Sequence, residues 1–258
     1  MAKGSKAQYR GPDVLEATSP VRRYLEESRD LLTSIVLVLP LFVFYQVGVL
    51  AAGGIRNGVD FVSARMWMLV GEDLSVYLGI NAGILLVLLG VIAYLRRGGS
   101  LRPQIFPFVL AESALYAVFF GGAVLQFMTW LGFGGLLASG AGGELDFIQK
   151  LVLSVGAGFY EELVFRLIGM GGIYMVLTRF ARDVPTWVSA MLAVVLSSFV
   201  FSAIHHVGAL GDPFTLGVFM FRFFAGVLLA FIFYVRGFAV AVYTHAIYDI
   251  IVMSTQGG

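Results

Sequence analysis

The chain has 258 residues, of which 59% are hydrophobic and 13% are charged, and its net charge is +1. A soluble domain carries roughly 25% charged residues, so this composition excludes a soluble globular protein and favours a membrane protein. The small net charge gives no reason to expect a nucleic acid partner, and the absence of cysteine excludes disulfides and thiolate chemistry.

Residues 1–30 form a polar tail, and the apolar segments begin after it. A secretory signal would bring its apolar region sooner. The tail ends in VRRYLEESRD, which we expect to be a short charged helix that leads into the first membrane span.

Seven apolar runs follow, each long enough to cross a hydrocarbon core about 30 Å thick. They are Leu31–Ala52, Val76–Leu95, Ile105–Leu131, Phe147–Leu177, Trp187–Ile204, Phe214–Val235 and Ala239–Met253. The fourth run is overlong, and three glycines (Gly169, Gly171 and Gly172) could kink or divide it. Between the first two runs, FVSARMWMLV is expected to lie in the membrane interface. The sequence therefore predicts an all-α polytopic transmembrane helical bundle of about seven spans, between six and eight.

Most of the arginines flank one side of these spans. They are Arg22, Arg23, Arg29, Arg96, Arg97, Arg102, Arg179, Arg182 and Arg236, whereas the other side has Arg56, Arg65 and Lys150. Because cytoplasmic loops carry the excess of Lys and Arg, we expect the N-terminus in the cytoplasm and the C-terminus outside. If the fourth run divides into two crossings, the later part of this assignment inverts. The loop charges and the small size favour an integral protein of a bacterial-type inner membrane.

Several ionisable residues lie within the apolar runs or at their ends. They are Glu112, Glu161, Glu162, Arg166, Arg222 and Asp249, together with the three histidines of the chain, His205, His206 and His245. A charge near the bilayer centre costs about 2.5–3.5 kcal/mol on insertion scales. Residues that are kept at this cost must be paired with one another or have a function.

The stretch FYEELVFR places two adjacent carboxylates in the fourth run. Glu162 and Arg166 are four residues apart, so they share a helix face and are able to pair. Glu161 is rotated by about 100° from Glu162 and faces a different neighbour. A cluster of structural ion pairs is the alternative interpretation, but it leaves Glu161 without a partner.

Two further runs supply histidines. In FSAIHH, Phe201 and His205 share a face, while His206 is rotated toward the following loop. In THAIYDI, His245 and Asp249 share a face of the last run, where a carboxylate one turn away can fix the tautomer of the imidazole. The alternatives are an ordinary interfacial histidine and a polar pair that satisfies itself on one helix.

Together, these residues favour hydrolysis in a hydrated cavity inside the membrane. A buried glutamate is able to act as a general base near neutral pH, and an imidazole can share the proton or donate to an oxyanion. The same residues could instead hold a divalent metal such as zinc, with Glu161, His205 and His245 as ligands. An ion-coupled transporter or proton relay would use similar residues, although we find no internal repeat of the kind common in transporters. A non-catalytic scaffold or immunity protein is a further alternative.

Three of these motifs are similar to those of a known family. EELVFR fits the pattern EExxxR, FSAIH fits FxxxH and HAIYD fits HxxxN/D, in this order on successive spans. Over about residues 147–253 the chain resembles the CPBP family of intramembrane proteases, which includes the CAAX prenyl proteases and bacteriocin-processing proteins. The resemblance implies a catalytic core over 147–258, preceded by N-terminal transmembrane helices over 31–146.

The resemblance also implies roles for single residues. Glu161 would activate water together with His205. On the oxyanion side, the site would be lined by His245 and Asp249. The helix would be supported, and the acid oriented, by Glu162 and Arg166. Asp249 stands where asparagine is commoner in the family. An ionised aspartate cannot donate a hydrogen bond, so Asp249 would have to be protonated, orient His245 or bind a metal. The family has been described both with and without a metal.

The remaining candidates concern substrate and partners. Glu112 is expected to pair with Arg222 as a structural contact, although Arg222 could instead bind a substrate carboxylate. Tyr248 and Phe201 are candidates for the substrate-binding surface. The expected partners are membrane lipid and a membrane-associated peptide or protein substrate; its identity, and whether it is prenylated, stay open.

Overall fold

The computed structural model describes residues 19–51, 69–71, 73–98, 101–136, 146–208 and 211–255. Within these ranges the secondary structure is helical, no strand is present, and seven helices are long and apolar enough to cross a membrane. The prediction of an all-α bundle with about seven spans is confirmed. Residues 61–68 of the expected interfacial segment lie outside the described residues.

The helices follow the predicted runs closely. They are α1 (Pro20–Ser28), α2 (Leu31–Ala51), α4 (Leu74–Leu95), η1 (Pro103–Ile105), α5 (Phe106–Trp130), η2 (Gly134–Leu136), α6 (Phe147–Glu161), η3 (Glu162–Met170), α7 (Gly171–Phe180), α8 (Thr186–Ile204), α9 (Leu216–Arg236) and α10 (Phe238–Thr255). The short charged helix expected before the first span is α1. It begins where the side chain of Ser19 accepts a hydrogen bond from the backbone N–H of Arg22.

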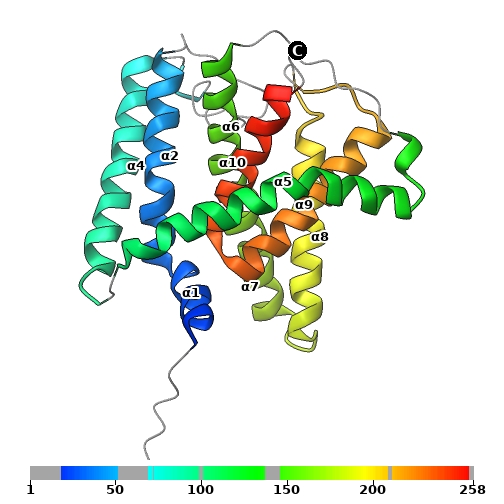
Figure 1. Ribbon diagram of the computed structural model, residues 1–258, viewed down its shortest axis with the longest axis horizontal. Helices are drawn as coiled ribbons and strands as arrows, with labels where there is room; N and C mark the ends of the chain where they lie inside the picture. Colours follow the sequence, from blue (N-terminus) through cyan, green and yellow to red (C-terminus); the bar gives the residue numbers. More distant parts are fainter. Residues whose placement is uncertain are drawn as a thin grey trace, which may run out of the picture.

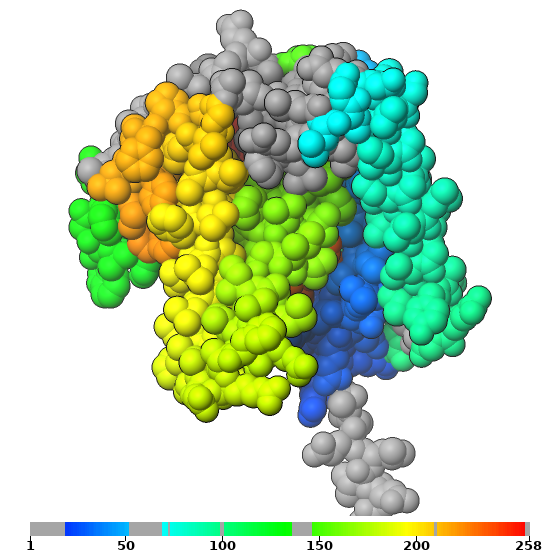
Figure 2. All heavy atoms as spheres, turned by 180° about the vertical axis from the view of Figure 1, so that it is seen from behind, coloured from blue at the N-terminus to red at the C-terminus, as the bar shows by residue number. Residues whose placement is uncertain are grey.

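The last helix, α10, lies at the centre of the bundle. It packs chiefly against α6 and α5, and also against α9 and α2. In Figure 1, α2, α4, α6, α8 and α10 run roughly along one direction, while α5 and α9 cross them obliquely. Seen from behind, α10 shows only at narrow gaps between the other helices (Figure 2). The motifs at the end of the sequence therefore lie inside the molecule.

The fourth span is a single helix of 34 residues, Phe147–Phe180, and it is not divided. Its irregular part is a π-helical segment, η3, which begins at Glu162, ahead of the three glycines that were expected to kink or divide the helix. Inside a bilayer each backbone N–H and C=O needs an internal partner, which favours a continuous helix even where glycine occurs. π-helical turns are frequent at functional sites, and this one begins at the paired carboxylates.

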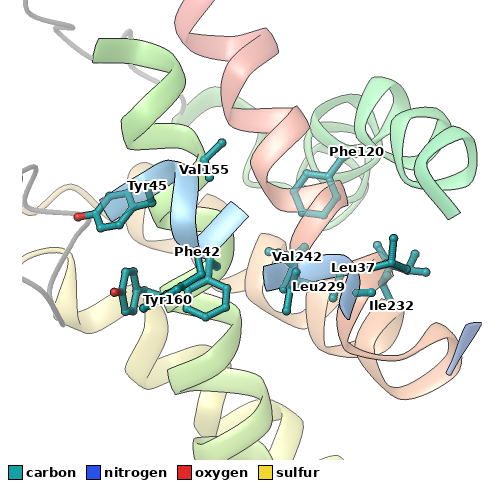
Figure 3. Packing of buried hydrophobic residues seen from close by; sticks show 14 of the residues in the cluster. Leu37, Phe42, Tyr45, Phe120, Val155, Tyr160, Leu229, Ile232 and Val242 are labelled. Carbon is teal, nitrogen blue, oxygen red and sulfur yellow. The ribbon is translucent and has the colours of Figure 1, made fainter. Parts of the chain in front are cut away.

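Small residues allow α6 to approach its neighbours closely. A Cβ added at Gly158 would lie 2.7 Å from the backbone nitrogen of Ala246 in α10, and a side chain at Gly156 would overlap the ring of Tyr45 in α2. Around this contact the core is apolar and aromatic, as Figure 3 shows for Tyr45 and Tyr160. In a membrane, close packing of small residues is a main source of helix association.

One end of the bundle, which we call the α1 end, collects α1, the start of α5, and the turn between α9 and α10. At this end Glu112 of α5 forms an ion pair with Arg236 of α9, with 2.5 Å between Glu112 Oε1 and Arg236 Nε. The expected pairing of Glu112 with Arg222 is wrong. Because α5 and α9 run in opposite directions, the start of α5 meets the end of α9, and Arg222 lies near the opposite end of α9.

Helix α1 completes this cluster. The hydroxyl of Tyr24 donates a hydrogen bond to Glu112, and Arg236 donates to the hydroxyl of Ser28 over 3.1 Å. Burial and the bond to Glu112 raise the pKa of the Tyr24 hydroxyl above its ordinary value, so it remains a donor over the whole physiological range. The Glu112–Arg236 pair therefore ties α1 to the bundle just before α10 begins.

Candidate active site

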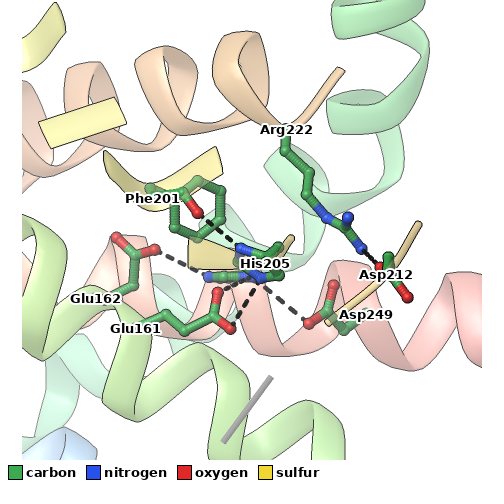
Figure 4. Close-up of polar contacts among 8 residues, drawn as sticks. Glu161, Glu162, Phe201, His205, Asp212, Arg222 and Asp249 are labelled. Atoms are coloured by element: carbon green, nitrogen blue, oxygen red, sulfur yellow. Dashed lines mark hydrogen bonds and ion pairs between the residues drawn. The ribbon is translucent and has the colours of Figure 1, made fainter. Parts of the chain in front are cut away.

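Three helices bring the ionisable residues of the motifs to one place (Figure 4). Glu161 is the last residue of α6, His205 caps the C-terminal end of α8, and His245 lies in α10. Glu161 is the fifteenth residue of a helix of 34 residues, so at a rise of about 1.5 Å per residue it lies roughly 20 Å from Phe147. The site is therefore at membrane depth.

The carboxylate of Glu161 faces both imidazoles. Its Oε1 atom lies 3.4 Å from Nε2 of His205, and its Oε2 atom lies 3.7 Å from Nε2 of His245. All three side chains are buried. Oε1 of Glu161 has no hydrogen-bond partner among the residues that the structure describes. These separations are too long for strong direct hydrogen bonds but suit groups that are bridged by one small molecule such as water.

The other ring nitrogen of each histidine is held in place. Nδ1 of His205 lies 2.7 Å from the carbonyl oxygen of Phe201, and Nδ1 of His245 lies 2.9 Å from Oε1 of Glu162. A carbonyl or carboxylate oxygen only accepts, so in each ring Nδ1 carries the proton and donates. In a neutral ring, Nε2 is then an acceptor, and it points at Glu161, which is also an acceptor. A group that donates to both sides is required between them.

Glu162 and Arg166 form the predicted pair. Nε of Arg166 lies 3.2 Å from Oε2 of Glu162, and both side chains are almost completely buried. Arg166 also donates to the carbonyl oxygen of Gly226 in α9 over 3.4 Å. The resemblance implied that this pair supports the helix and orients the acid Glu161, which stays a prediction; the structure adds a contact of Glu162 with His245.

Phe201 lies beneath the site. Its ring centre is 4.9 Å from that of His205 and 4.4 Å from the guanidinium carbon of Arg166. The side chain is buried, and its ring also packs edge to face against Phe165, with 5.3 Å between the ring centres. It supports the imidazole of His205 and covers the positive charge of Arg166.

Asp249 completes the polar group from one turn below His245, with 3.5 Å between its Oδ2 atom and Nε2 of His245. The site thus contains three carboxylates against one guanidinium. If all carboxylates are ionised and both imidazoles are neutral, two negative charges are in excess in a buried place. The site therefore favours added positive charge, either a proton on an imidazole or carboxylate or a bound cation.

Two of the predicted substrate-binding residues do not join the group. Arg222 pairs with Asp212 in the segment that follows α8, with 2.5 Å between Nη2 and Oδ2. The backbone N–H of Asp212 in turn donates to the carbonyl oxygen of His205 over 2.8 Å. Tyr248 packs on α5, with its ring centre 4.8 Å from that of Phe120.

His206 faces the following segment, as predicted, and its Nδ1 donates to the carbonyl oxygen of Asp212 over 3.1 Å. The motifs did not reveal the contribution of Asp212 and of the carbonyl of Gly226. Arg222 was a signal for the first of these, because an arginine inside an apolar run needs a nearby acid, and Asp212 precedes it by ten residues.

A known family matches the part of the chain that contains this site. Residues 143–251 match the family model described as type II CAAX prenyl endopeptidase, Rce1-like. The chain carries an Rce1-like domain over this range. This confirms the resemblance to the CPBP group over the last spans and supports a CAAX-type intramembrane endopeptidase in general. No curated protein and no solved structure gave a match.

The Rce1-like match covers the α6–α10 part of the chain, and all the residues of the polar site lie within it. Glu112 and α1, which form the cluster at the α1 end with Arg236, lie outside the matched range, whereas Arg236 falls inside it. The polar site around Glu161 is therefore separate in space from the Glu112–Arg236 pair at the α1 end.

The side chains of this Rce1-like site are of the types that bind zinc, because the carboxylate of Glu161 faces Nε2 of both His205 and His245. Nδ1 of each histidine is held by a hydrogen-bond acceptor, as is usual for histidine ligands of a metal. As the side chains stand, however, no three His, Cys, Asp or Glu residues in the described ranges have the arrangement of a metal site. A zinc ion held by Glu161, His205 and His245 would need these side chains to draw closer, and it stays a prediction.

Proposed function

We propose that this protein hydrolyses peptide bonds of a membrane-associated peptide or protein, with water activated between Glu161 and His205. The observation that supports this most directly is that two acceptors, the Glu161 carboxylate and Nε2 of His205, face each other at 3.4 Å in a buried site. A water molecule that donates one hydrogen bond to each would satisfy both. Such a water would be polarised toward hydroxide.

In the proposed reaction, Glu161 takes a proton from the water, and the hydroxide adds to the carbonyl carbon of the scissile peptide bond. The carbonyl oxygen becomes an oxyanion and accepts a hydrogen bond from Nε2 of His245. For this, His245 carries protons on both nitrogens, which the excess of negative charge around it favours. When the tetrahedral intermediate breaks down, the proton held by Glu161 passes to the leaving nitrogen, and an acid and an amine result.

In this proposal, Asp249 stabilises the protonated His245 as its counter-charge, so it need not donate to the oxyanion itself. This role follows from its distance of 3.5 Å to Nε2 of His245. It also accounts for aspartate at a position where the family more commonly has asparagine. A variant that carries asparagine at 249 is therefore expected to keep activity with an altered pH profile.

The test is a comparison of N-terminal and C-terminal peptides from membranes of cells that contain the wild-type protein, the Glu161→Gln variant or neither. We expect a set of new termini that depends on the wild-type protein and is lost in the variant. The sequences around those termini would identify the substrate class, whether a prenylated C-terminal peptide, a leader peptide or another membrane protein.

Adjacent histidines provide a matched control. His205→Ala is expected to abolish the same cleavages, because it removes the ring that faces Glu161. His206→Ala, one residue along the chain, removes a ring that faces the following segment and is expected to preserve them. Normal termini from the Glu161→Gln variant would contradict the proposed base and favour a non-catalytic scaffold. Ion flux in proteoliposomes without any cleavage would favour a transporter.

Metal analysis of purified protein tests the other chemistry open to the same residues. About one zinc per chain, lost in His205→Ala but kept in His206→Ala, would assign Glu161, His205 and His245 as ligands. Cleavage that continues after treatment with a strong chelator would support water activation by the glutamate without metal.

The location proposed for this activity is a bacterial-type inner membrane, with the N-terminus in the cytoplasm. It rests on the arginines that flank the α1 end and on an odd number of crossings.

A further inference from the structure

A large cavity lies at the α1 end, outside the candidate active site. Its volume is about 1080 Å³, and it is formed by α1, η1 and the first turns of α5. Residues that matter for its chemistry are Val21, Arg23, Glu27, Arg102, Ile105 and Phe108. None of these takes part in the contacts around Glu161. The cavity therefore needs an explanation of its own.

Two arginines converge at the mouth of this cavity. Nε of Arg23 lies 2.9 Å from Oε1 of Glu27, and Nη1 of Arg102 lies 2.8 Å from the same oxygen. One carboxylate thus holds two guanidinium groups side by side and neutralises only one of the charges. Each guanidinium has five N–H donors, most of which these contacts leave available. The mouth is a positively charged site with several donors that suits a phosphate group.

The walls below the mouth are apolar. Phe108 is 65% exposed and Val21 is 66% exposed, so both present apolar surface at the cavity. The polar group that reaches the cavity from the core, Glu112, is already neutralised by Arg236 and bonded to Tyr24. A ligand that fits this site therefore has an anionic group at one end and an apolar body that extends over Phe108 and Val21.

The position in the membrane agrees with such a ligand. The α1 end carries the arginines that flank the spans, and exposed apolar residues of α1 such as Leu25 indicate that this helix lies in the membrane interface. Basic pockets beside transmembrane helices on this side of a membrane attract anionic lipid headgroups. A free phosphate or sugar phosphate would leave the apolar walls exposed to water.

We propose that this cavity binds one anionic phospholipid, with its phosphate on the N–H donors of Arg23 and Arg102 that Glu27 leaves available and its acyl chains along Phe108 and Val21. The inference does not depend on the proteolytic activity. Bound lipid would link α1 to the start of α5, and through the Glu112–Arg236 pair it would brace the turn that precedes α10.

The experiment uses the purified full-length chain in a neutral detergent, and native mass spectrometry with thermal unfolding measures the binding of phosphatidylglycerol. We expect one molecule bound per chain and a melting temperature that rises with the lipid concentration. Arg23→Gln combined with Arg102→Gln is expected to weaken binding about tenfold or more, because at least one charge-assisted hydrogen bond is lost. Arg179→Gln combined with Arg182→Gln, which removes two arginines from the same end but outside the cavity, is the matched control and should bind normally.

Four outcomes would overturn the proposal. Equal binding of phosphatidylcholine would mean that the cavity takes any lipid, and an equal effect of glycerol phosphate would mean that it is a site for phosphate alone. Unchanged binding in the Arg23/Arg102 variant would place the lipid elsewhere. If that variant does not fold, two other measurements test the proposal. They are the selectivity of the wild-type protein for phosphatidylglycerol over phosphatidylcholine and glycerol phosphate, and the binding of phosphatidylglycerol to the Phe108→Glu variant. Unchanged binding to Phe108→Glu would also contradict the proposal.

Discussion

Arg166 is among the largest side chains in this protein that are fully buried, and its charge is balanced by a single carboxylate, Glu162. Spacing within one helix was sufficient to predict this pair, because residues four apart meet on one face. The same argument predicted the proximity of His245 and Asp249. It could not predict that Glu162 binds His245, because a contact between helices depends on how each helix is rotated about its axis.

Arg166→Ala is expected to lower the free energy of unfolding by about 3–5 kcal/mol, because Glu162 is left as a buried charge without its partner. Cleavage should fall as well, since Glu162 then no longer holds His245 in a fixed position. Thermal unfolding in detergent measures the first effect. The double variant Glu162→Gln with Arg166→Met has no unpaired charge and should regain part of the stability but not the activity. A fully stable Arg166→Ala protein would show that the pair is not a structural contact.

At the scale of helices, the sequence predicted each span but not which spans touch. The incorrect pairing of Glu112 with Arg222 came from choosing an acid and a base by their charge alone. The actual partner, Arg236, is set by the antiparallel contact of α5 with α9, and by α1, which covers the pair with Tyr24 and Ser28. Contacts of this kind depend on small residues along the helix faces, whose pairing a single sequence does not reveal.

Gly158 is expected to be essential for the contact of α6 with α10. In Gly158→Ala the added Cβ would lie 2.7 Å from the backbone nitrogen of Ala246, so the two helices must separate. Overpacking of this type costs about 1–3 kcal/mol, and it moves Glu161 away from His245. Cleavage and thermal unfolding should both be impaired. Gly122→Ala in α5, where the added Cβ meets nothing within 4 Å, is the control and should behave as wild type.

Glu112→Gln tests the cluster that holds α1. The variant leaves Arg236 as a largely buried charge, and we expect a loss of about 3 kcal/mol in the free energy of unfolding. Proteolysis of the folded protein in detergent should then cut at α1 sooner than in wild type, because the hydroxyl of Tyr24 has lost its charged acceptor. Equal protection of α1 in both proteins would contradict the role of this pair as its anchor.

At the scale of the whole molecule, composition and the apolar runs were sufficient to predict the class of fold and the number of crossings. Continuity of the fourth span was not predictable from its glycines, because the requirement for backbone hydrogen bonds in lipid opposes a break. The position of the site was predictable only as a convergence of three motifs. Its geometry depends on α10 lying at the centre of the bundle, a feature that no local pattern in the sequence indicates.

The absence of cysteine in the chain makes its orientation simple to test with single-cysteine variants. Glu26→Cys lies in α1, and Thr255→Cys lies at the end of α10, and both positions are exposed. With seven crossings and the N-terminus inside, a membrane-impermeant thiol reagent should label Thr255→Cys in intact cells and Glu26→Cys only after permeabilisation. Labelling of both from the same side would contradict an odd number of crossings.

The proposed hydrolysis depends on Glu161 and His205 acting together on one water molecule. A double-mutant cycle on the identified substrate tests this most directly, with rates of cleavage for wild type, Glu161→Gln, His205→Ala and the double variant. Residues that act as a unit are strongly non-additive, so the double variant should lose no more activity than either single variant. If the two losses multiply, Glu161 and His205 act in independent steps, and the proposed shared water is contradicted.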